Sequence, residues 1–206
     1  MSNAISSLTP HKPDLTHLLV PARLVVLNAP DSLIHPQVIQ SLALRTAQGK
    51  RVGLIIGHNR FALHALTRSA HYLHIPTTDV LNRIDLSRAF TCFQMHQRIQ
   101  TIDEKILRQW HTLYVLGLLD TFYDESVPYR QVARLLQDTL LRLQQIVKSG
   151  LPVLITVSLP KQLGREGLIK LVADMTDEYW EFAKDNSTAE SAQLEMPLRM
   201  EPQERK

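Results

Sequence analysis

The sequence has few of the features that mark an exported or membrane-bound protein. Its 206 residues include one cysteine, Cys92, which excludes an intramolecular disulfide and a zinc site built from cysteines. No apolar run approaches the roughly 18 residues that a membrane-spanning helix needs. The amino-terminal residues lack the charged and apolar regions of a secretory signal. We therefore expect a cytoplasmic protein with no membrane partner.

Glycine is scarce, and the net charge is small. The chain has 7 glycines, with 44% hydrophobic and 21% charged residues, which is typical of a globular protein and excludes a fibrous or largely disordered one. It carries 23 Lys and Arg against 20 Asp and Glu, a net charge of +3. This balance lies far from that of a strongly basic nucleic-acid-binding domain, so charge alone does not identify a partner.

The two ends of the chain differ in composition from the middle. Residues 1–17 contain two prolines and no apolar periodicity, and residues 184–206 contain two prolines and charges of both signs. Segments of this kind bury too little apolar surface to fold. We predict a flexible arm over 1–17, one folded domain over 18–183 and a disordered tail over 184–206.

Apolar runs alternate with amphipathic helical patterns across the middle of the chain. Strands are predicted at residues 23–27, 52–56, 80–84, 113–119, 151–157 and, as an edge strand, 178–182. Helices are predicted at residues 36–48, 61–73, 128–149 and 168–173, and Pro36 lies in the first turn of the first of them. A further helix is predicted to follow Ser87, which would cap it. This alternation predicts an α/β fold with a mainly parallel sheet covered by helices on both faces.

Five segments between residues 24 and 157 resemble the ATPase core of the RecA-type recombinases, the RadA-like branch in particular. The most specific runs from Val80-Leu81-Asn82-Arg83-Ile84 through Ser87-Arg88-Ala89-Phe90 to Gln94, because it is irregular and no strand or helix period demands it. The others are residues 29–43, 49–61, 113–123 and 154–156, in the order and with the spacing of the family. The resemblance implies a RecA-like core of the P-loop NTPase fold.

The same resemblance implies that the ATP-binding residues are missing. In the family motif Gly-x-x-x-x-Gly-Lys-Thr, the glycines let the backbone wrap around phosphate, the lysine neutralises its charge and the threonine binds magnesium. The corresponding residues here are Ala29, Ile34, His35 and Pro36. The acidic position after the second strand is occupied by His58.

The magnesium-binding aspartate is also replaced. Its position falls on Leu116 in the register that we prefer, and on Asp120 if the register is shifted. Phosphoryl transfer depends on positioning and on charge neutralisation. The resemblance therefore implies a protein that is not an ATPase and takes no cofactor. An alternative is a nucleotide-sensing relative that binds a nucleotide without hydrolysing it.

Two further features concern partners. The strand at 151–157 is followed by Lys161, Arg165 and Lys170. The resemblance places a DNA-binding loop at this position. These residues either contact DNA weakly and without sequence preference or belong to an ordinary solvated loop. Arg88 either bridges loop and sheet or contacts a neighbouring subunit. The resulting hypothesis is an inactive RecA/RadA-like paralogue that serves as an accessory or scaffold in DNA recombination and repair. Its partner would be DNA, an active RecA-like ATPase or another repair protein.

A second hypothesis is an α/β enzyme of unrelated chemistry. Its site would lie at the carboxyl ends of the strands, around Asn28, His58 and Asp120, because ligands of open α/β sheets bind at that edge. The first hypothesis predicts partner binding without turnover, and the second predicts a deep pocket lined by these three residues. We expect no metal site.

Overall fold

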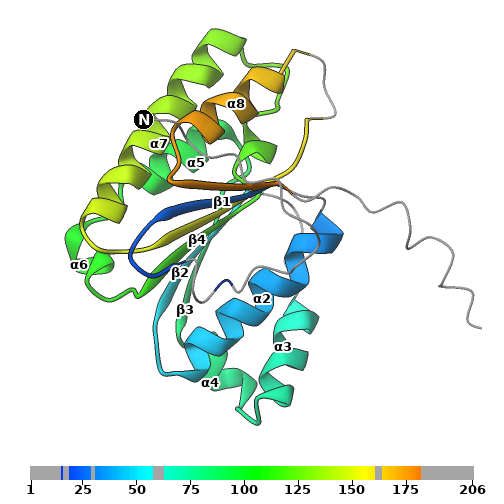
Figure 1. Cartoon of the computed structure of the whole chain (residues 1–206), viewed down its shortest axis with the longest axis vertical. Helices are drawn as coiled ribbons and strands as arrows, with labels where there is room; N and C mark the ends of the chain where they lie inside the picture. Colours follow the sequence, from blue (N-terminus) through cyan, green and yellow to red (C-terminus); the bar gives the residue numbers. More distant parts are fainter. Residues whose placement is uncertain (1–14, 16–18, 29–30, 58–62, 161–163, 182–206) are drawn as a thin grey trace, which may run out of the picture.

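A single parallel sheet organises the molecule. The computed structural model describes residues 15, 19–28, 31–57, 63–160 and 164–181, and their six strands lie in the order β3-β2-β4-β5-β1-β6 (Figure 1). All neighbouring strands pair in parallel. The strands are β1 (Leu24–Asn28), β2 (Val52–Ile56), β3 (Ile84–Arg88), β4 (Thr112–Leu116), β5 (Val153–Val157) and β6 (Glu178–Glu181). The predicted α/β class and parallel sheet are confirmed.

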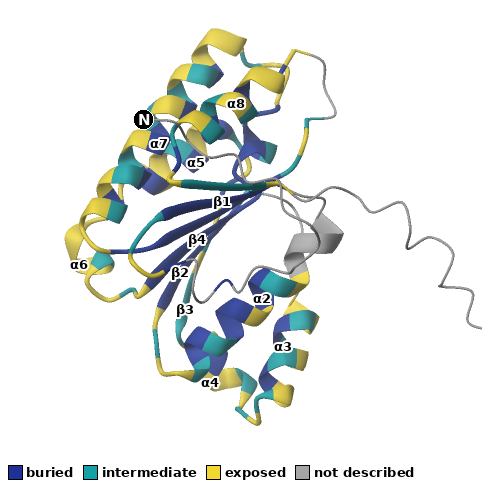
Figure 2. Cartoon of the chain, viewed as in Figure 1, coloured by how far each residue is buried: buried dark blue, intermediate teal, exposed yellow. Residues whose placement is uncertain are grey.

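The four inner strands are buried along their whole length (Figure 2). They consist mainly of valine, leucine and isoleucine, which suit a sheet that is covered on both faces. The edge strands β3 and β6 are only partly buried. Two kinds of contact fix β6 against β1. Asp177 is hydrogen-bonded to the main chain of Leu24 through both its amide and its carboxylate, and Arg23 forms an ion pair with Glu178.

Helices cover both faces of the sheet (Figure 1). On one face lie α2 (Asp31–Ala47), α3 (Leu63–Tyr72) and α4 (Thr77–Leu81), and on the other lie α5 (Cys92–Gln100), α7 (Tyr129–Lys148) and α8 (Glu166–Asp174), with the short α6 (Glu104–Leu107) near the edge. The most amphipathic is α7, which buries Val132, Leu136, Leu140 and Leu143 at helical spacing. None of these described helices is long and apolar enough to cross a bilayer.

Two predicted elements near the β3 edge are wrong. Residues 80–84 were expected to form a strand, but α4 reaches Leu81 and the strand runs from Ile84 to Arg88. Ser87 therefore lies inside β3, and the helix that follows is capped by Thr91, whose side chain accepts a hydrogen bond from the Gln94 main chain at 3.2 Å. An edge strand that alternates polar and apolar residues has no continuous apolar run to reveal it.

The strand at 113–119 is shorter than predicted. β4 ends at Leu116, and Gly117 follows with a φ of 66°, a left-handed conformation that glycine adopts at little cost. The chain then forms a 3-10 turn over Leu119–Thr121. Residues 117–119 are apolar because they are buried just beyond the end of β4, and they do not continue the strand.

The first helix begins earlier than predicted, and the folded part includes one residue of the expected arm. α2 starts at Asp31, so Pro36 lies inside the helix and not in its first turn. Pro36 is the sixth residue of α2, so it lacks the main-chain hydrogen bond to the carbonyl four residues earlier and its ring crowds that carbonyl. Leu15 is 4% exposed and belongs to the same core cluster as Leu19. The rest of the arm and the tail from residue 184 lie outside the described residues.

Candidate functional site at the carboxyl edge of the sheet

The order of the strands identifies one edge of the sheet as the expected ligand site. β1 and β5 are neighbours, yet the chain leaves β1 toward α2 on one face and leaves β5 toward α8 on the other. Such a divergence opens a crevice beyond the carboxyl ends of the two strands, where open α/β folds bind their ligands. The side chains at this edge therefore form the candidate site.

Asn28 ends β1 and is hydrogen-bonded to the neighbouring strand. It is 2% exposed, and its Nδ2 donates to the Tyr179 hydroxyl at 2.8 Å and to Glu181 Oε1 at 3.4 Å. Burial raises the pKa of Tyr179 and the charge of Glu181 raises it further, although the Asn28 hydrogen bond acts in the opposite direction. Tyr179 therefore stays a neutral hydrogen-bonding group and is not a base near neutral pH.

A second group joins the ends of β4 and β5. The Ser158 hydroxyl donates to Asp120 Oδ1 at 2.9 Å, and the Tyr123 hydroxyl donates to the Ser158 carbonyl at 2.6 Å. Burial, together with the nearby Asp120 charge, raises the pKa of Tyr123 well above its ordinary value. These contacts hold the turn after β4 against the segment after β5.

Two glycines bring the ends of β2 and β4 into close contact. A Cβ on Gly57 would lie 2.4 Å from the Gly117 carbonyl oxygen, so no larger residue fits at position 57 without movement. The Gly117 amide donates to Thr156 Oγ1 at 2.9 Å, and the Gly57 amide donates to the Leu116 carbonyl at 2.7 Å. The backbone amides that end these strands are therefore already paired within the chain.

Arg165 closes the α7 and α8 side of this edge. It is 6% exposed, and its Nη2 donates to the carbonyls of Asp124 and Val127, each at 2.7 Å. Its guanidinium also lies 5.9 Å from the centre of the Tyr129 ring. The side chain holds the segment before α7 and is not offered to solvent, so a contact with DNA would require it to leave these partners.

The residues that resemble a degenerate phosphate loop are mostly helical. α2 includes the backbone of Ile34, His35 and Pro36, whereas Ala29 and His58 lie outside the described residues. A phosphate loop wraps its main-chain amides around the anion before its helix begins. With α2 starting three residues after Asn28, the described backbone of positions 31–36 follows a helical path and not a wrapped one.

The two alternative positions for the magnesium ligand have different surroundings. Leu116 is the last residue of β4 and its side chain is buried in the core against α2. Asp120 lies in the 3-10 turn and reaches Ser158 at the carboxyl edge. Asn28 and Asp120 thus lie at the same edge of the sheet, but each is hydrogen-bonded to a different set of partners.

The other predicted site residues are spread over the surface. Arg88 is exposed at the end of the edge strand β3, and within the described chain its side chain forms no hydrogen bond or ion pair; the bridge between loop and sheet is therefore not observed there. Lys170 is exposed on α8, and Lys161 lies outside the described residues. Among the residues that are described, no group of three potential metal ligands comes together.

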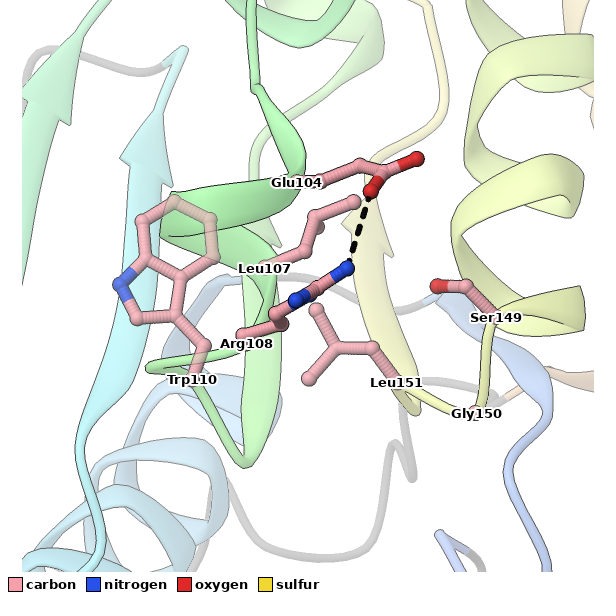
Figure 3. Close-up of a pocket in the computed structure, with 7 residues that line it drawn as sticks. All are labelled: Glu104, Leu107, Arg108, Trp110, Ser149, Gly150 and Leu151. Atoms are coloured by element: carbon pink, nitrogen blue, oxygen red, sulfur yellow. Dashed lines mark hydrogen bonds and ion pairs between the residues drawn. The ribbon is translucent and has the colours of Figure 1, made fainter.

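A hollow of about 420 Å³ lies at the opposite, amino-terminal edge of the sheet (Figure 3). Its walls include Leu107, Trp110 and Leu151, which precede β4 and β5. Its two charged side chains, Glu104 and Arg108, form an ion pair at 3.2 Å with each other. This exposed pair provides no uncompensated charge for a ligand, and the hollow is remote from the carboxyl edge.

Sequence reasoning missed most of the carboxyl-edge contacts. Ser158, Tyr179 and Glu181 were not singled out, and only their position just beyond or within a short strand could have drawn attention to them. A comparison with protein-family models finds no match to this chain, and a comparison with curated protein sequences finds none either.

Proposed function

We propose that this chain is a non-hydrolysing relative of the RecA-type ATPases that serves as an accessory or scaffold subunit in DNA recombination or repair. The observation that carries the proposal is the helical backbone of α2 from Asp31 through Pro36. Those residues align with the phosphate loop of the family, and a helical path there does not direct successive amides at a phosphate group.

The carboxyl edge of the sheet supports the same proposal. Asn28, Asp120 and Arg165, which could otherwise face a ligand, are hydrogen-bonded to Tyr179, Ser158 and two main-chain carbonyls. To bind a substrate through the atoms that make these bonds, each group would first have to give up a hydrogen bond within the chain. The edge is built as a structural junction, and the ordered resemblance of five segments provides the link to recombination proteins.

The open β3 edge supplies a surface for a protein partner. Arg88 is exposed there without a described partner, and an edge strand leaves one row of main-chain groups unpaired. A scaffold acts through such surfaces and needs no turnover. We expect Arg88 to lie at a contact with another subunit.

Affinity purification from the native host tests this function. With nucleic acid digested during purification, we expect the tagged protein to capture an intact RecA-type ATPase or another repair protein, and to change the DNA-dependent activity of that partner when the two are mixed. Arg88→Glu should weaken the capture, whereas Arg68→Glu, which changes an exposed arginine on α3, should not.

Two results would contradict the proposal. One is ATP hydrolysis by the isolated chain at a rate that exceeds that of a matched blank preparation. The other is turnover of a small substrate that Asn28→Ala or Asp120→Ala abolishes in a protein that still folds, which would favour an α/β enzyme of unrelated chemistry.

A further inference from the structure

A basic groove runs between α7 and α8 on the outer surface of the molecule. The two helices pack side by side on the same face of the sheet (Figure 1). Between them is a hollow of about 490 Å³ whose lining includes Tyr129, Arg130, Arg134, Lys170 and Asp174. At one end the groove adjoins the carboxyl edge, because Tyr129 contacts Arg165.

The cations of this groove are not neutralised by the described chain. Arg130, Arg134 and Lys170 are exposed, and their side chains have no hydrogen bond or ion pair within the described residues. Asp174 is the one acidic side chain in the lining, which leaves a net charge of +2 from three cations and one anion. Arg130 and Arg134 are one helical turn apart, a rise of about 6 Å along α7, and Lys170 faces them from α8.

Tyr129 gives the groove an aromatic wall that is held in place. Tyr129 is 43% exposed, with the Arg165 guanidinium 5.9 Å from the centre of its ring. Its hydroxyl fills the space at Gly167, where a Cβ would come within 2.4 Å of the oxygen. A fixed, exposed ring beside several cations is the combination with which proteins bind single-stranded nucleic acid, by stacking on bases and neutralising phosphates.

The composition of the groove favours phosphates over an acidic peptide. The lining contains two aliphatic side chains, Ala133 and Leu171, too few to receive the several apolar anchors that a helical peptide presents at i, i+3, i+4 and i+7. Arginine, in contrast, matches the geometry of a phosphate with two parallel hydrogen bonds. Two arginines and a lysine on facing helices suit a backbone that carries regularly spaced charges.

We infer that the groove between α7 and α8 binds the phosphodiester backbone of single-stranded nucleic acid through Arg130, Arg134 and Lys170. This inference rests on the proposed function and gives it a nucleic-acid surface. Of the three residues that the sequence suggested for DNA contact, only Lys170 belongs to this surface. Two arginines of α7 take the place of the buried Arg165, and the proposed contact lies on the two helices and not on the loop after β5.

Fluorescence anisotropy with a labelled 30-nucleotide single strand, titrated at salt concentrations from about 20 to 200 mM, tests the inference. We expect the parent protein to show a log–log salt slope of roughly −2, which three neutralised phosphates produce on a single strand. The triple variant Arg130→Gln, Arg134→Gln, Lys170→Gln should bind about tenfold more weakly or worse at low salt and should lose most of this slope.

The matched control removes the same charge elsewhere. The triple variant Arg68→Gln, Arg98→Gln, Lys105→Gln changes exposed cations of α3, α5 and α6 and should bind like the parent. Thermal denaturation checks that both variants fold. If the groove triple variant does not fold, the single variant Arg134→Gln should still reduce the slope by about 0.7.

Three outcomes would overturn the inference. The first is an equal loss of affinity for the strand in the groove and control variants. The second is no binding by the parent even at about 20 mM salt. The third is displacement of the strand by poly-glutamate at lower concentration than by unlabelled DNA, which would indicate an acidic protein partner. None of these outcomes bears on partner capture or nucleotide binding, so the failure of the groove and the failure of the proposed function are distinguishable.

Discussion

At the scale of single residues, three of the polar side chains that sequence patterns mark as functional, Asn28, Asp120 and Arg165, are hydrogen-bonded within the chain. Arg165 is the clearest case, because its position after β5 suggests a DNA contact while its guanidinium is buried against two carbonyls. Asn28 likewise reaches across to Tyr179, which lies 151 residues later in the chain. No local pattern reveals such long-range partners, so the sequence identifies these residues but not their roles.

Arg165→Ala is expected to lower the free energy of unfolding by about 2–4 kcal/mol, because it leaves two carbonyls without their charged donor. Urea denaturation measures the change. Lys170→Ala, an exposed change on α8, the helix that Arg165 precedes, should stay within about 0.5 kcal/mol of the parent. An Arg165→Ala protein that is as stable as the parent but has lost nucleic-acid binding would restore the loop after β5 as the contact surface.

At the scale of elements, the strands with continuous apolar runs could be predicted and the irregular ones could not. β1, β2, β4 and β5 are buried on both faces, and burial of this kind leaves an unbroken run in the sequence. β3 is half-exposed at the edge and was displaced by four residues in the prediction. The start of α2 was also misplaced, because proline is common in the first turn of a helix and Pro36 suggested one there.

The variant Pro36→Ala tests whether α2 begins at Asp31, as in the structure, or at Pro36, as the sequence pattern suggests. If the helix begins at Asp31, the substitution restores a main-chain donor and removes a steric conflict inside the helix, and the free energy of unfolding should rise by about 1–3 kcal/mol. Thermal denaturation is the measurement. Pro128→Ala, which changes the cap before α7, should give no comparable gain. A neutral or destabilising Pro36→Ala would place the helix start at Pro36 and reopen the preceding residues as a loop.

At the scale of the whole molecule, the two faces of the sheet are covered by different helices and have separate cores. The face covered by α2, α3 and α4 contains Leu15 and Leu19 in its core, so the folded unit extends to a residue that composition assigned to a flexible arm. The other face carries α7 and α8 with the basic groove between them. The class of the fold followed from alternating patterns in the sequence, whereas the groove required the two helices to be placed side by side.

Leu15→Ala tests the extent of the folded unit. Because Leu15 is 4% exposed within a core cluster, the truncation should cost about 2–5 kcal/mol of unfolding free energy. Leu159→Ala removes a leucine that is 64% exposed and should change stability by less than about 0.5 kcal/mol. Equal stabilities of the two variants in urea would mean that Leu15 belongs to an arm and not to the core.

Calorimetric titration of the full chain with ATP and magnesium tests the central claim, which is that the ATPase site of the resembled family does not function in this protein. The helical backbone of positions 31–36 and the hydrogen-bonded carboxyl edge predict no measurable heat of binding at millimolar nucleotide. A dissociation constant below about 100 μM, equivalent to a binding free energy of about −5.5 kcal/mol, would contradict this account and would show that the chain retains a nucleotide site.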